Sequence, residues 1–411
     1  MSYLEAQPSV YLITASGSYE TGQVDALCQS LAEYSVTILD LCQAEIYKTL
    51  TLALLVEIPD HQEVSRVFKD ILYTAHGQGL TIQYRAVDRS RYQAWMDSQQ
   101  GRRVIITVLG RTFSAGHIAA ITDFLRRSGL DIERVNRLSN RQPLHAGRSE
   151  DHLTCFEFAV RGESADLHSM RAACLDISRD FDIDIGVQED TAYRRYRRLI
   201  AFDMDSTLVQ TEIIDELADL AGVRKEVEAI TAAAMRGELD FRESLERRVG
   251  LLRGLDCREL DRLAESLPLT EGAERLIANL KVLGYKIAVL SGGFSYFGSR
   301  LQERLGIDYL YANDLDAQDG KLTGSIRGDI VDGPRKAELL RFIAEKEQIS
   351  LEQTVAVGDG ANDLPMLNLA GLGIAFHAKP LVRQGAKQAI SNVGLDAVLY
   401  FLGLTDREAL L

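Results

Sequence analysis

Two aspartates, Asp203 and Asp205, stand one residue apart at the point where the apolar run of residues 199–202 ends. If that run forms a strand, residues two apart point the same way, so the two carboxylates lie side by side. Like charges at that separation repel each other unless a cation or a shared proton stabilises them. The carboxyl ends of strands are also where α/β sheets bind their ligands. The pair therefore predicts a site for acid–base chemistry or for a metal ion.

Ser291, Gly292 and Lys336 add groups that can bind an anion. Ser291 and Gly292 follow the apolar run of residues 287–290, where the start of a helix presents backbone N–H groups. Lys336 stands at the entry to a predicted helix over residues 337–347, where its flexible ammonium can neutralise phosphate charge. Taken alone, a lysine in a first helical turn is more often a solvated surface residue. The interpretation as an anion site therefore depends on the other segments lying nearby.

A fourth segment, residues 358–363, follows the predicted strand at residues 354–357 and holds Asp359, Asn362 and Asp363. Mg²⁺ prefers hard oxygen ligands and retains water and substrate phosphate oxygens, so these carboxylates predict a magnesium site. Each carboxylate on its own is compatible with an ordinary turn. Because the four segments follow strands or begin helices, we expect them to converge on one crevice that binds a phosphoryl group and a metal.

The elements that must position these residues have the pattern of a doubly wound parallel α/β sheet. Short apolar strands are predicted at residues 199–202, 286–290, 354–357 and 373–375, with amphipathic helices between them. Between the first two strands, a largely helical insert runs from about residue 212 to residue 268, which is too long for a simple crossover. We expect this insert to form a cap over the carboxyl edge of the sheet.

The first half of the chain repeats itself at a spacing of about 94 residues, which suits a duplicated small domain. Each copy is predicted as strand, helix, strand, strand, helix, strand, the order of a ferredoxin-like sandwich. The predicted elements lie at residues 10–15, 20–34, 36–40, 50–58, 63–76 and 80–87, and again at residues 104–109, 116–127, 131–138, 154–160, 166–180 and 182–188. The polar segment of residues 140–152 is predicted to be a long hairpin loop inside the second copy.

Length and charge set limits on the organisation and partners of the chain. Its 411 residues exceed what one core usually supports, and we expect three domains, at residues 1–95, 96–192 and 193–411. The net charge of -14 disfavours nucleic acid and anionic membranes as partners. The run of arginines and tyrosines from Tyr193 to Arg198 is therefore predicted to be a solvated junction rather than an RNA-binding segment.

The distribution of apolar residues and cysteines points to the cytoplasm. No apolar run reaches about twenty residues, and the N-terminal residues lack a basic-then-apolar secretion signal, so we expect neither a membrane span nor export. The five cysteines are scattered and form no Cys-x-x-Cys pair. This pattern predicts reduced thiols rather than a disulfide framework or a zinc site.

From about residue 198 to residue 404 the chain resembles the haloacid dehalogenase superfamily and, within it, the phosphoserine phosphatase family. The resemblance rests on residues 203–209, 290–294 and 357–363. It implies that Asp203 is a nucleophile that becomes an aspartyl-phosphate and that Asp205 is the general acid and then the general base. It also implies Mg²⁺ held by the Asp203 carboxylate, the Asp205 main-chain carbonyl and Asp359. The implied supporting residue is Asp363, and the implied phosphoryl-binding residues are Ser291, Gly292, Lys336 and Asn362.

The same resemblance assigns substrate choice to the cap. Glu212 matches the family glutamate that meets the substrate ammonium, and Arg248 matches the arginine that binds the α-carboxylate. Met235 and Phe241 match apolar residues that close over the substrate; without the family they would be interpreted as helix core, and Arg248 as a surface charge. The implied substrate is O-phospho-L-serine, hydrolysed to L-serine and phosphate in the last step of serine biosynthesis. A capped phosphatase for another small phosphomonoester is the nearer alternative.

The two N-terminal copies resemble ACT domains, which sense amino acids and commonly pair edge to edge. The family's glycine pattern at the first strand–helix turn is present at Gly17 and Gly22, with Tyr19 where aspartate is usual. The resemblance implies an amino acid effector at these domains and a homodimer. Two further interpretations stay open: a structural or dimer-forming role for the copies, and an amino-acid-responsive regulatory protein whose phosphatase half is vestigial.

Overall fold

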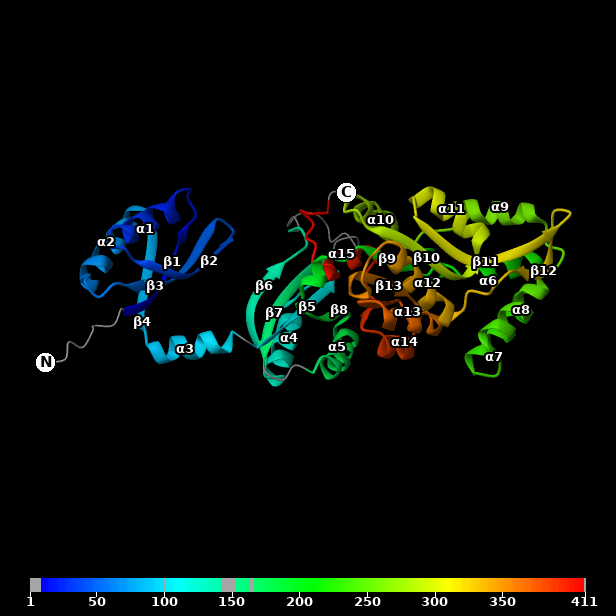
Figure 1. Ribbon diagram of the computed structural model, residues 1–411, viewed down its shortest axis with the longest axis horizontal. Helices are drawn as coiled ribbons and strands as arrows, with labels where there is room; N and C mark the ends of the chain where they lie inside the picture. Colours follow the sequence, from blue (N-terminus) through cyan, green and yellow to red (C-terminus); the bar gives the residue numbers. More distant parts are fainter. Residues whose placement is uncertain (1–8, 100, 142–152, 163–165, 410–411) are drawn as a thin grey trace. The chain divides into compact units, whose positions relative to one another are not determined.

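The computed structural model describes residues 9–99, 101–141, 153–162 and 166–409 (Figure 1). Its contacts divide the chain into two compact units, Met1–Gly101 and Arg102–Leu411. The second unit contains both the second ferredoxin-like copy and the parallel sheet. The predicted boundary at about residue 192 lies inside that unit and stays a prediction.

Within the described part of the first unit, four antiparallel strands form a sheet in the order β2-β3-β1-β4, the order of a ferredoxin-like sandwich. Leu50, Leu52, Leu54 and Val56 alternate along β3 and face the core beneath the helices, which explains why this strand was predicted from its pattern. One further helix, α3, was not predicted. The elements are β1 (Ser9–Ser18), α1 (Gln23–Ala32), β2 (Thr37–Ile46), β3 (Thr49–Ile58), α2 (Val64–Gly77), β4 (Leu80–Val87) and α3 (Arg89–Ser98).

The second copy has the same topology. Its described strands form a sheet in the order β6-β7-β5-β8, which confirms the predicted ferredoxin-like order. The elements are β5 (Arg102–Gly110), α4 (Ala115–Arg127), β6 (Asp131–Arg137), β7 (Thr154–Gly162), α5 (Leu167–Phe181) and β8 (Asp184–Glu189). Most of the predicted hairpin loop, residues 142–152, lies outside the described residues.

A larger sheet follows, with seven strands among the described residues in the order β12-β11-β10-β9-β13-β14-β15. The strand β9 is central and pairs in parallel with β10 and β13, so the predicted doubly wound arrangement is confirmed. The strands β11, β12 and β15 were not predicted. The bounds are β9 (Leu199–Phe202), β10 (Lys286–Phe294), β11 (Tyr309–Gln318), β12 (Lys321–Arg327), β13 (Thr354–Gly358), β14 (Leu372–Phe376) and β15 (Gln388–Ile390).

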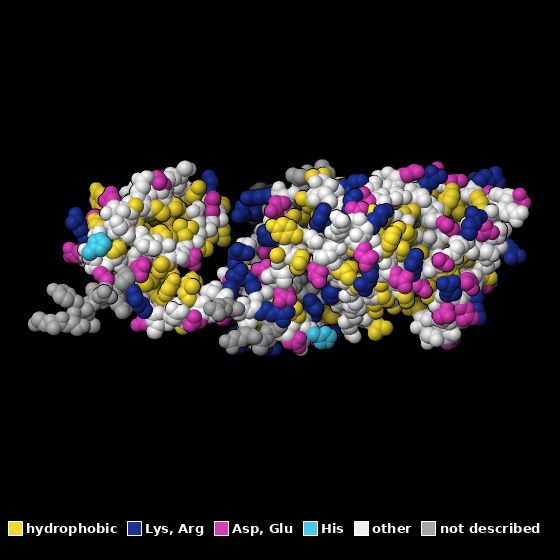
Figure 2. All heavy atoms as spheres, in the orientation of Figure 1, with side chains coloured by type: hydrophobic (Ala, Val, Ile, Leu, Met, Phe, Trp, Pro, Cys, Tyr) yellow, Lys and Arg dark blue, Asp and Glu magenta, His cyan; other side chains and the backbone are white. Residues whose placement is uncertain are grey.

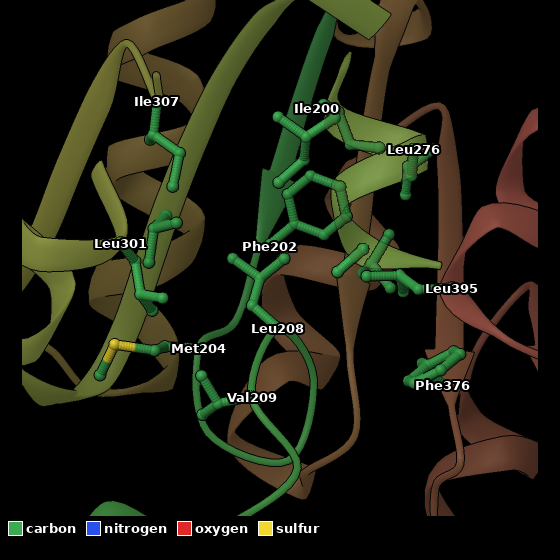
Figure 3. Close-up of a cluster of buried hydrophobic side chains, with 14 of the residues drawn as sticks. Ile200, Phe202, Met204, Leu208, Val209, Leu276, Leu301, Ile307, Phe376 and Leu395 are labelled. Carbon is green, nitrogen blue, oxygen red and sulfur yellow. The ribbon is translucent and has the colours of Figure 1, made fainter. Parts of the chain in front are cut away.

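Alternate residues of β9 pack into different clusters on the two sides of this sheet. Ile200 and Phe202 lie in a cluster with Leu276, which belongs to α10, as Figure 3 shows. Leu199 and Ala201 pack into a second cluster that contains residues of α12 and α13. The elements on the two sides and at the sheet ends are α10 (Ala273–Val282), α11 (Ser295–Leu305), α12 (Gly333–Lys346), η2 (Leu351–Gln353), η3 (Ala361–Asp363), α13 (Leu364–Leu369), α14 (Pro380–Gly385), η4 (Leu395–Ala397) and α15 (Val398–Phe401).

The predicted helical insert is present between β9 and β10. It consists of α6 (Ile213–Ala221), α7 (Arg224–Met235), α8 (Phe241–Leu251) and α9 (Cys257–Ser266). Its two ends meet at a backbone bridge between Val209 and Leu269. A second attachment joins it to β12, because the Gly254 N–H donates to the Leu322 carbonyl at 2.8 Å. The insert is therefore fastened to the sheet at two places.

The second ferredoxin-like sheet and the parallel sheet pack directly against each other. The Gln388 side chain of β15 accepts a hydrogen bond from the Val187 N–H at 2.8 Å and donates to the Val187 carbonyl at 2.6 Å. It thereby pairs with the edge strand β8 as a neighbouring strand would. Asp184, at the start of β8, accepts hydrogen bonds from the backbone N–H groups of Ser391 at 2.8 Å and Asn392 at 2.9 Å.

The arginine run at the junction is a correction to the sequence prediction. Arg194, in η1 (Ala192–Arg195), is only 2% exposed and pairs with Glu157 of β7 at 2.5 Å. Arg197 is 9% exposed, and its Nη1 donates to the Thr354 carbonyl at 3.3 Å. The prediction of a solvated junction is wrong for these two residues, because Arg194 pairs with a buried carboxylate and Arg197 donates to main-chain carbonyls of the segment that leads into β13.

Acidic and basic side chains are interspersed over the face of the molecule drawn in Figure 2. Among the residues that the structure describes, no helix combines the length and the apolar character needed to cross a bilayer.

Candidate active site

Asp203 and Asp205 follow the end of β9, with one core residue, Met204, between them in the sequence. Met204 between them is fully buried and lies with Leu208 and Val209 just past the strand (Figure 3). The strand ends at Phe202, and the chain turns directly after Asp203, which places the Asp205 side chain next to Gly293 at the end of β10. The Asp203 N–H donates to the Val357 carbonyl at 2.9 Å, so the turn after β9 is held against the end of β13.

Lys336 lies at the centre of the site and is fully buried. Its Nζ lies 2.8 Å from Asp203 Oδ2 and 2.7 Å from Asp363 Oδ1. Burial alone would lower the pKa of this lysine, but the two carboxylates outweigh burial and raise its pKa above the usual 10.5. Lys336 therefore remains an ammonium, and the alternative of a solvated lysine in a helix start is wrong.

Asp203, Asp359 and Asp363 form an acidic cluster, with one oxygen from each lying within 4.8 Å of the others. Burial and the neighbouring carboxylates raise the pKa of Asp359 to about 8, and burial and Asp203 raise that of Asp363 to about 7. One ammonium thus faces three carboxylates in a largely buried site. Such a set of hard oxygen donors fits a divalent cation, whose charge would relieve the repulsion.

Asp205 lies beside the cluster and differs from Asp203 in its surroundings. Partial burial, together with the charges of Glu212 and Asp203, raises the pKa of Asp205 well above 3.8. The raised pKa favours the protonated form of this carboxyl, the form that a general acid requires. The residue after it, Ser206, adopts a left-handed conformation with φ of 54° and donates from Oγ to Glu212 Oε1 at 2.7 Å.

The segment of residues 291–293, hereafter the phosphate loop, interrupts the pairing between β10 and β11. The Gly293 N–H donates to Ser291 Oγ at 2.9 Å, and Ser291 is fully buried. A Cβ on Gly292 would lie 2.8 Å from Cζ of Phe241, so the ring of this cap residue lies directly against the loop. Only glycine leaves room for that contact.

The cap residues named from the sequence fall into two groups. The first group lies near the carboxyl edge of the sheet and consists of Glu212, Arg248 and Phe241. Partial burial lowers the pKa of Arg248. The nearby carboxylates of Glu212, Asp215 and Asp205 oppose that shift. Arg248 thus faces the acids that flank Asp203. Met235, at the end of α7, is 62% exposed, and its sulfur contacts Lys379 Nζ at 3.4 Å. The structure therefore does not bring Met235 into the cluster with the others.

Three residues near the cluster were not singled out from the sequence, although two of them belong to the quoted motif. Thr207, fully buried, has Oγ1 at 3.4 Å from Asp359 Oδ1, and Ser206 positions Glu212. Asn313 of β11 contacts the phosphate loop from behind, with its Nδ2 at 2.8 Å from the Gly292 carbonyl. Asn362 precedes Asp363 in η3, and a Cβ on Gly333 would lie 2.7 Å from its main-chain carbonyl oxygen, so Asn362 packs against the start of α12.

The arrangement combines a carboxylate beside a buried ammonium, a carboxyl of raised pKa two residues away, an acidic cluster that fits a divalent cation and a glycine-containing loop at the end of β10. These are the parts needed to transfer a phosphoryl group to a carboxylate and then to water. Arg248 and Glu212 of the cap add charges of both signs beside Asp203 and Asp205. A zwitterionic phosphate ester matches this set.

Known proteins similar to this chain agree with the geometry. The family model described as haloacid dehalogenase-like hydrolase matches residues 197–371, and that described as ACT domain matches residues 9–85. A phosphoserine phosphatase of Streptomyces coelicolor is 41% identical over 397 residues, which cover 97% of this chain and 93% of that protein. One of Mycobacterium tuberculosis is 40% identical over 398 residues, with coverage of 97% and 94%. A solved relative is the unliganded crystal structure of a probable phosphoserine phosphatase of Vibrio cholerae, which is 34% identical and has a TM-score of 0.58. The matched region covers 74% of this chain and 87% of that chain.

Proposed function

The chain belongs to the phosphoserine phosphatase family of haloacid dehalogenase-like hydrolases, and from this premise we propose that it hydrolyses O-phospho-L-serine through an aspartyl-phosphate on Asp203. The reaction releases L-serine and phosphate, as the last step of serine biosynthesis requires. The observation that carries the proposal is the contact of 2.8 Å between the Asp203 carboxylate and the buried Lys336, next to Asp359 and Asp363. An ammonium there can bind the phosphoryl oxygens while the carboxylate attacks.

In the first step, an Asp203 oxygen bonds to phosphorus while the bond from phosphorus to the serine oxygen breaks. Asp205 gives its proton to the departing oxygen, so L-serine leaves as a neutral alcohol. The raised pKa of Asp205 supports this role, because a carboxyl that is ionised at neutral pH has no proton to give.

In the second step, Asp205, now a carboxylate, takes a proton from water. The water oxygen bonds to phosphorus and the bond from phosphorus to Asp203 breaks, which releases phosphate and regenerates both aspartates. Ser291, the Gly292 N–H, Lys336 and Asn362 are proposed to hold the phosphoryl oxygens in both steps. Because this transition state is stabilised chiefly by electrostatics, the fixed position of these donors is their main contribution.

Mg²⁺ is the proposed cofactor. When bound, it would supply positive charge that offsets the phosphoryl charge and lowers the barrier to attack by a carboxylate. The groups that we propose to hold it are the carboxylates of Asp203 and Asp359 and the main-chain carbonyl of Asp205, with Asp363 in support. Support comes from the acidic cluster and from the raised pKa values of Asp359 and Asp363, which indicate an excess of negative charge.

The cap is proposed to select an amino acid. Arg248 would bind the α-carboxylate of the substrate and Glu212 its ammonium, with Phe241 closing over the side-chain methylene. Steady-state assays of the full chain on phosphoserine, phosphothreonine and simple phosphate esters test this proposal. We expect kcat/KM for phosphoserine to exceed that for the simple esters by about 100-fold or more. Equal values for all three would reject phosphoserine as the substrate.

We also propose that the ACT domain at residues 9–85 binds an amino acid effector, with L-serine as the candidate, and that the protein is a cytoplasmic homodimer. The match to the ACT family supports the first of these. Added L-serine should then change the rate of hydrolysis in the same assays by more than its competition with substrate at the active site explains.

A further inference from the structure

Asn313, in β11, is fully buried, and both ends of its side chain contact backbone groups near the active site. Its Nδ2 donates to the Gly292 carbonyl at 2.8 Å, and its Oδ1 accepts from the Val331 N–H at 2.8 Å. A carbonyl can only accept and an N–H can only donate, so the two partners determine the orientation of the amide. Asn313 has no part in the proposed chemical steps.

The first contact fixes one peptide of the phosphate loop. The peptide between Gly292 and Gly293 has its carbonyl on Asn313 and its N–H on Ser291 Oγ, at 2.9 Å. Two opposed hydrogen bonds hold this plane against rotation, which glycines would otherwise permit. Because Ser291 Oγ accepts from Gly293, the hydroxyl hydrogen of Ser291 remains available to donate to a phosphoryl oxygen.

The second contact reaches the helix that carries Lys336. Val331 directly precedes Asp332, which caps α12 by accepting from the Arg335 N–H at 3.0 Å. Lys336 lies in the first turn of that helix and extends to Asp203. Asn313 therefore links the backbone of the phosphate loop to the segment that sets the start of α12.

We propose that Asn313 is a positioning residue that holds the phosphate loop and the start of α12 in register, so that Ser291 and Lys336 meet the same phosphoryl group. This inference rests on the proposed function of that loop. Asparagine is required because the position needs one donor and one acceptor side by side. Aspartate lacks the donor and alanine lacks both, so each variant frees the Gly292 carbonyl.

The test uses the full chain with Asn313→Asp and Asn313→Ala, and Asn279→Asp as the matched control. Asn279 is a second buried asparagine of the same unit, 2% exposed, whose Nδ2 donates to the Arg275 carbonyl at 2.8 Å in α10. Calorimetry in the presence of Mg²⁺ measures the affinity for inorganic phosphate and, separately, the affinity for L-serine. These two ligands represent the two halves of the substrate. Steady-state kinetics on phosphoserine give kcat and KM, and thermal melting monitors folding.

We expect both Asn313 variants to weaken phosphate binding at least about 10-fold and to lower kcat by about 10-fold to 100-fold, since small displacements of positioned groups have effects of that size. The affinity for L-serine should change less than about 2-fold. Asn279→Asp should lower the melting temperature without altering the ratio of the two affinities. Equal weakening of both ligands, unchanged phosphate affinity, or failure of both Asn313 variants to fold would overturn the proposal. Absence of phosphoserine hydrolysis by the wild type would instead reject the proposed function.

Discussion

Lys336 determines the charge balance of the site. An ammonium buried without a partner would be strongly destabilising, and two carboxylates at 2.7 and 2.8 Å compensate its burial. Both of those carboxylates are thereby engaged, so Asp359 has no buried ammonium of its own. Its raised pKa of about 8 reflects this imbalance. At the scale of single residues, the negative charge of the acidic cluster thus exceeds the positive charge of Lys336, and a bound cation would reduce that excess.

This imbalance predicts that binding of Mg²⁺ releases a proton. Below a pH of about 8, Asp359 is largely protonated in the cation-free protein, and the metal must displace that proton. The affinity for Mg²⁺ should therefore fall as the pH falls, by nearly tenfold per pH unit between about 7.5 and 6.5. Calorimetric titration in two buffers of different ionisation enthalpy measures the protons released.

Asp359→Asn is the informative variant for that experiment, because it removes the group that we expect to lose the proton. The variant should bind Mg²⁺ more weakly and release fewer protons. An affinity that is independent of pH in the wild type, with no buffer dependence of the heat, would contradict the assignment of the proton to this cluster.

At the scale of elements, the cap determines which ester reaches Asp203. The helix α8 carries two adjacent arginines with different environments: Arg248 faces Glu212 and Asp215, whereas Arg247 is exposed and pairs with Glu243. This difference offers a matched pair of variants on one helix. The rest of α8 stays the same, so lost helix stability affects both variants alike.

Arg248→Ala should lower kcat/KM for phosphoserine by about 100-fold or more, because the guanidinium would no longer bind the α-carboxylate. Phosphoethanolamine lacks that carboxylate, and its kcat/KM should change less than about 3-fold. Arg247→Ala should leave both substrates unaffected. If Arg248→Ala leaves phosphoserine turnover unchanged, the cap selects another phosphomonoester.

The elements that were predicted correctly are those with a buried, periodic pattern. The strands β9 and β13 are largely continuous apolar runs, and in β3 every second residue is buried. The missed elements lack such a signal: β11 and β12 form a hairpin with one buried residue in each strand, β15 has three residues, and α3 has no buried residue. Tertiary contacts decide their conformation, and these cannot be inferred from a local pattern.

The candidate site shows the same division. Asp203, Ser291, Lys336 and Asp359 could be named from motifs, because each follows a strand or begins a helix. Asn313 could not, since no motif surrounds this single asparagine in the sequence; its contacts are with the backbone groups of Gly292 and Val331, which lie elsewhere in the chain. The burial of Arg194 was likewise unpredictable, because its partner Glu157 lies on β7, 37 residues earlier in the chain.

At the scale of the whole molecule, the second unit joins a ferredoxin-like sheet to the parallel sheet through buried polar contacts. Asp184 is central to this junction: it accepts from the N–H groups of Ser391 and Asn392 and from Asn392 Nδ2 at 3.2 Å. Burial raises the pKa of Asp184 to about 6 in spite of these donors and of the nearby His377. Asp184 thus binds Ser391 and Asn392, the two residues that directly follow β15.

A carboxyl whose pKa is higher in the folded chain binds its proton more tightly there, so it favours folding at acid pH and loses that contribution as the pH rises through 6. Lowering the pH from about 7.5 to 5.5 should therefore stabilise the wild type relative to Asp184→Asn by about 1 kcal/mol. The difference in melting temperature between the two proteins should shift by roughly 1–3 °C.

Asp176→Asn serves as the control, because Asp176 is an exposed acid that pairs with Arg179 on the neighbouring helix α5. Its melting temperature relative to the wild type should not depend on pH in this range. A constant difference between the wild type and Asp184→Asn at both pH values would show that Asp184 is already ionised throughout.

The most direct test of the account is to locate the phosphoryl group during turnover. Phosphoserine labelled in its phosphate is mixed with the full chain and quenched in acid within milliseconds, and mass spectrometry of the peptides identifies the modified residue. We predict an acyl phosphate on Asp203 that hydroxylamine removes, and no such adduct in Asp203→Asn, which should lose at least about 1,000-fold in kcat. Label on another residue, or full turnover by Asp203→Asn, would contradict the account.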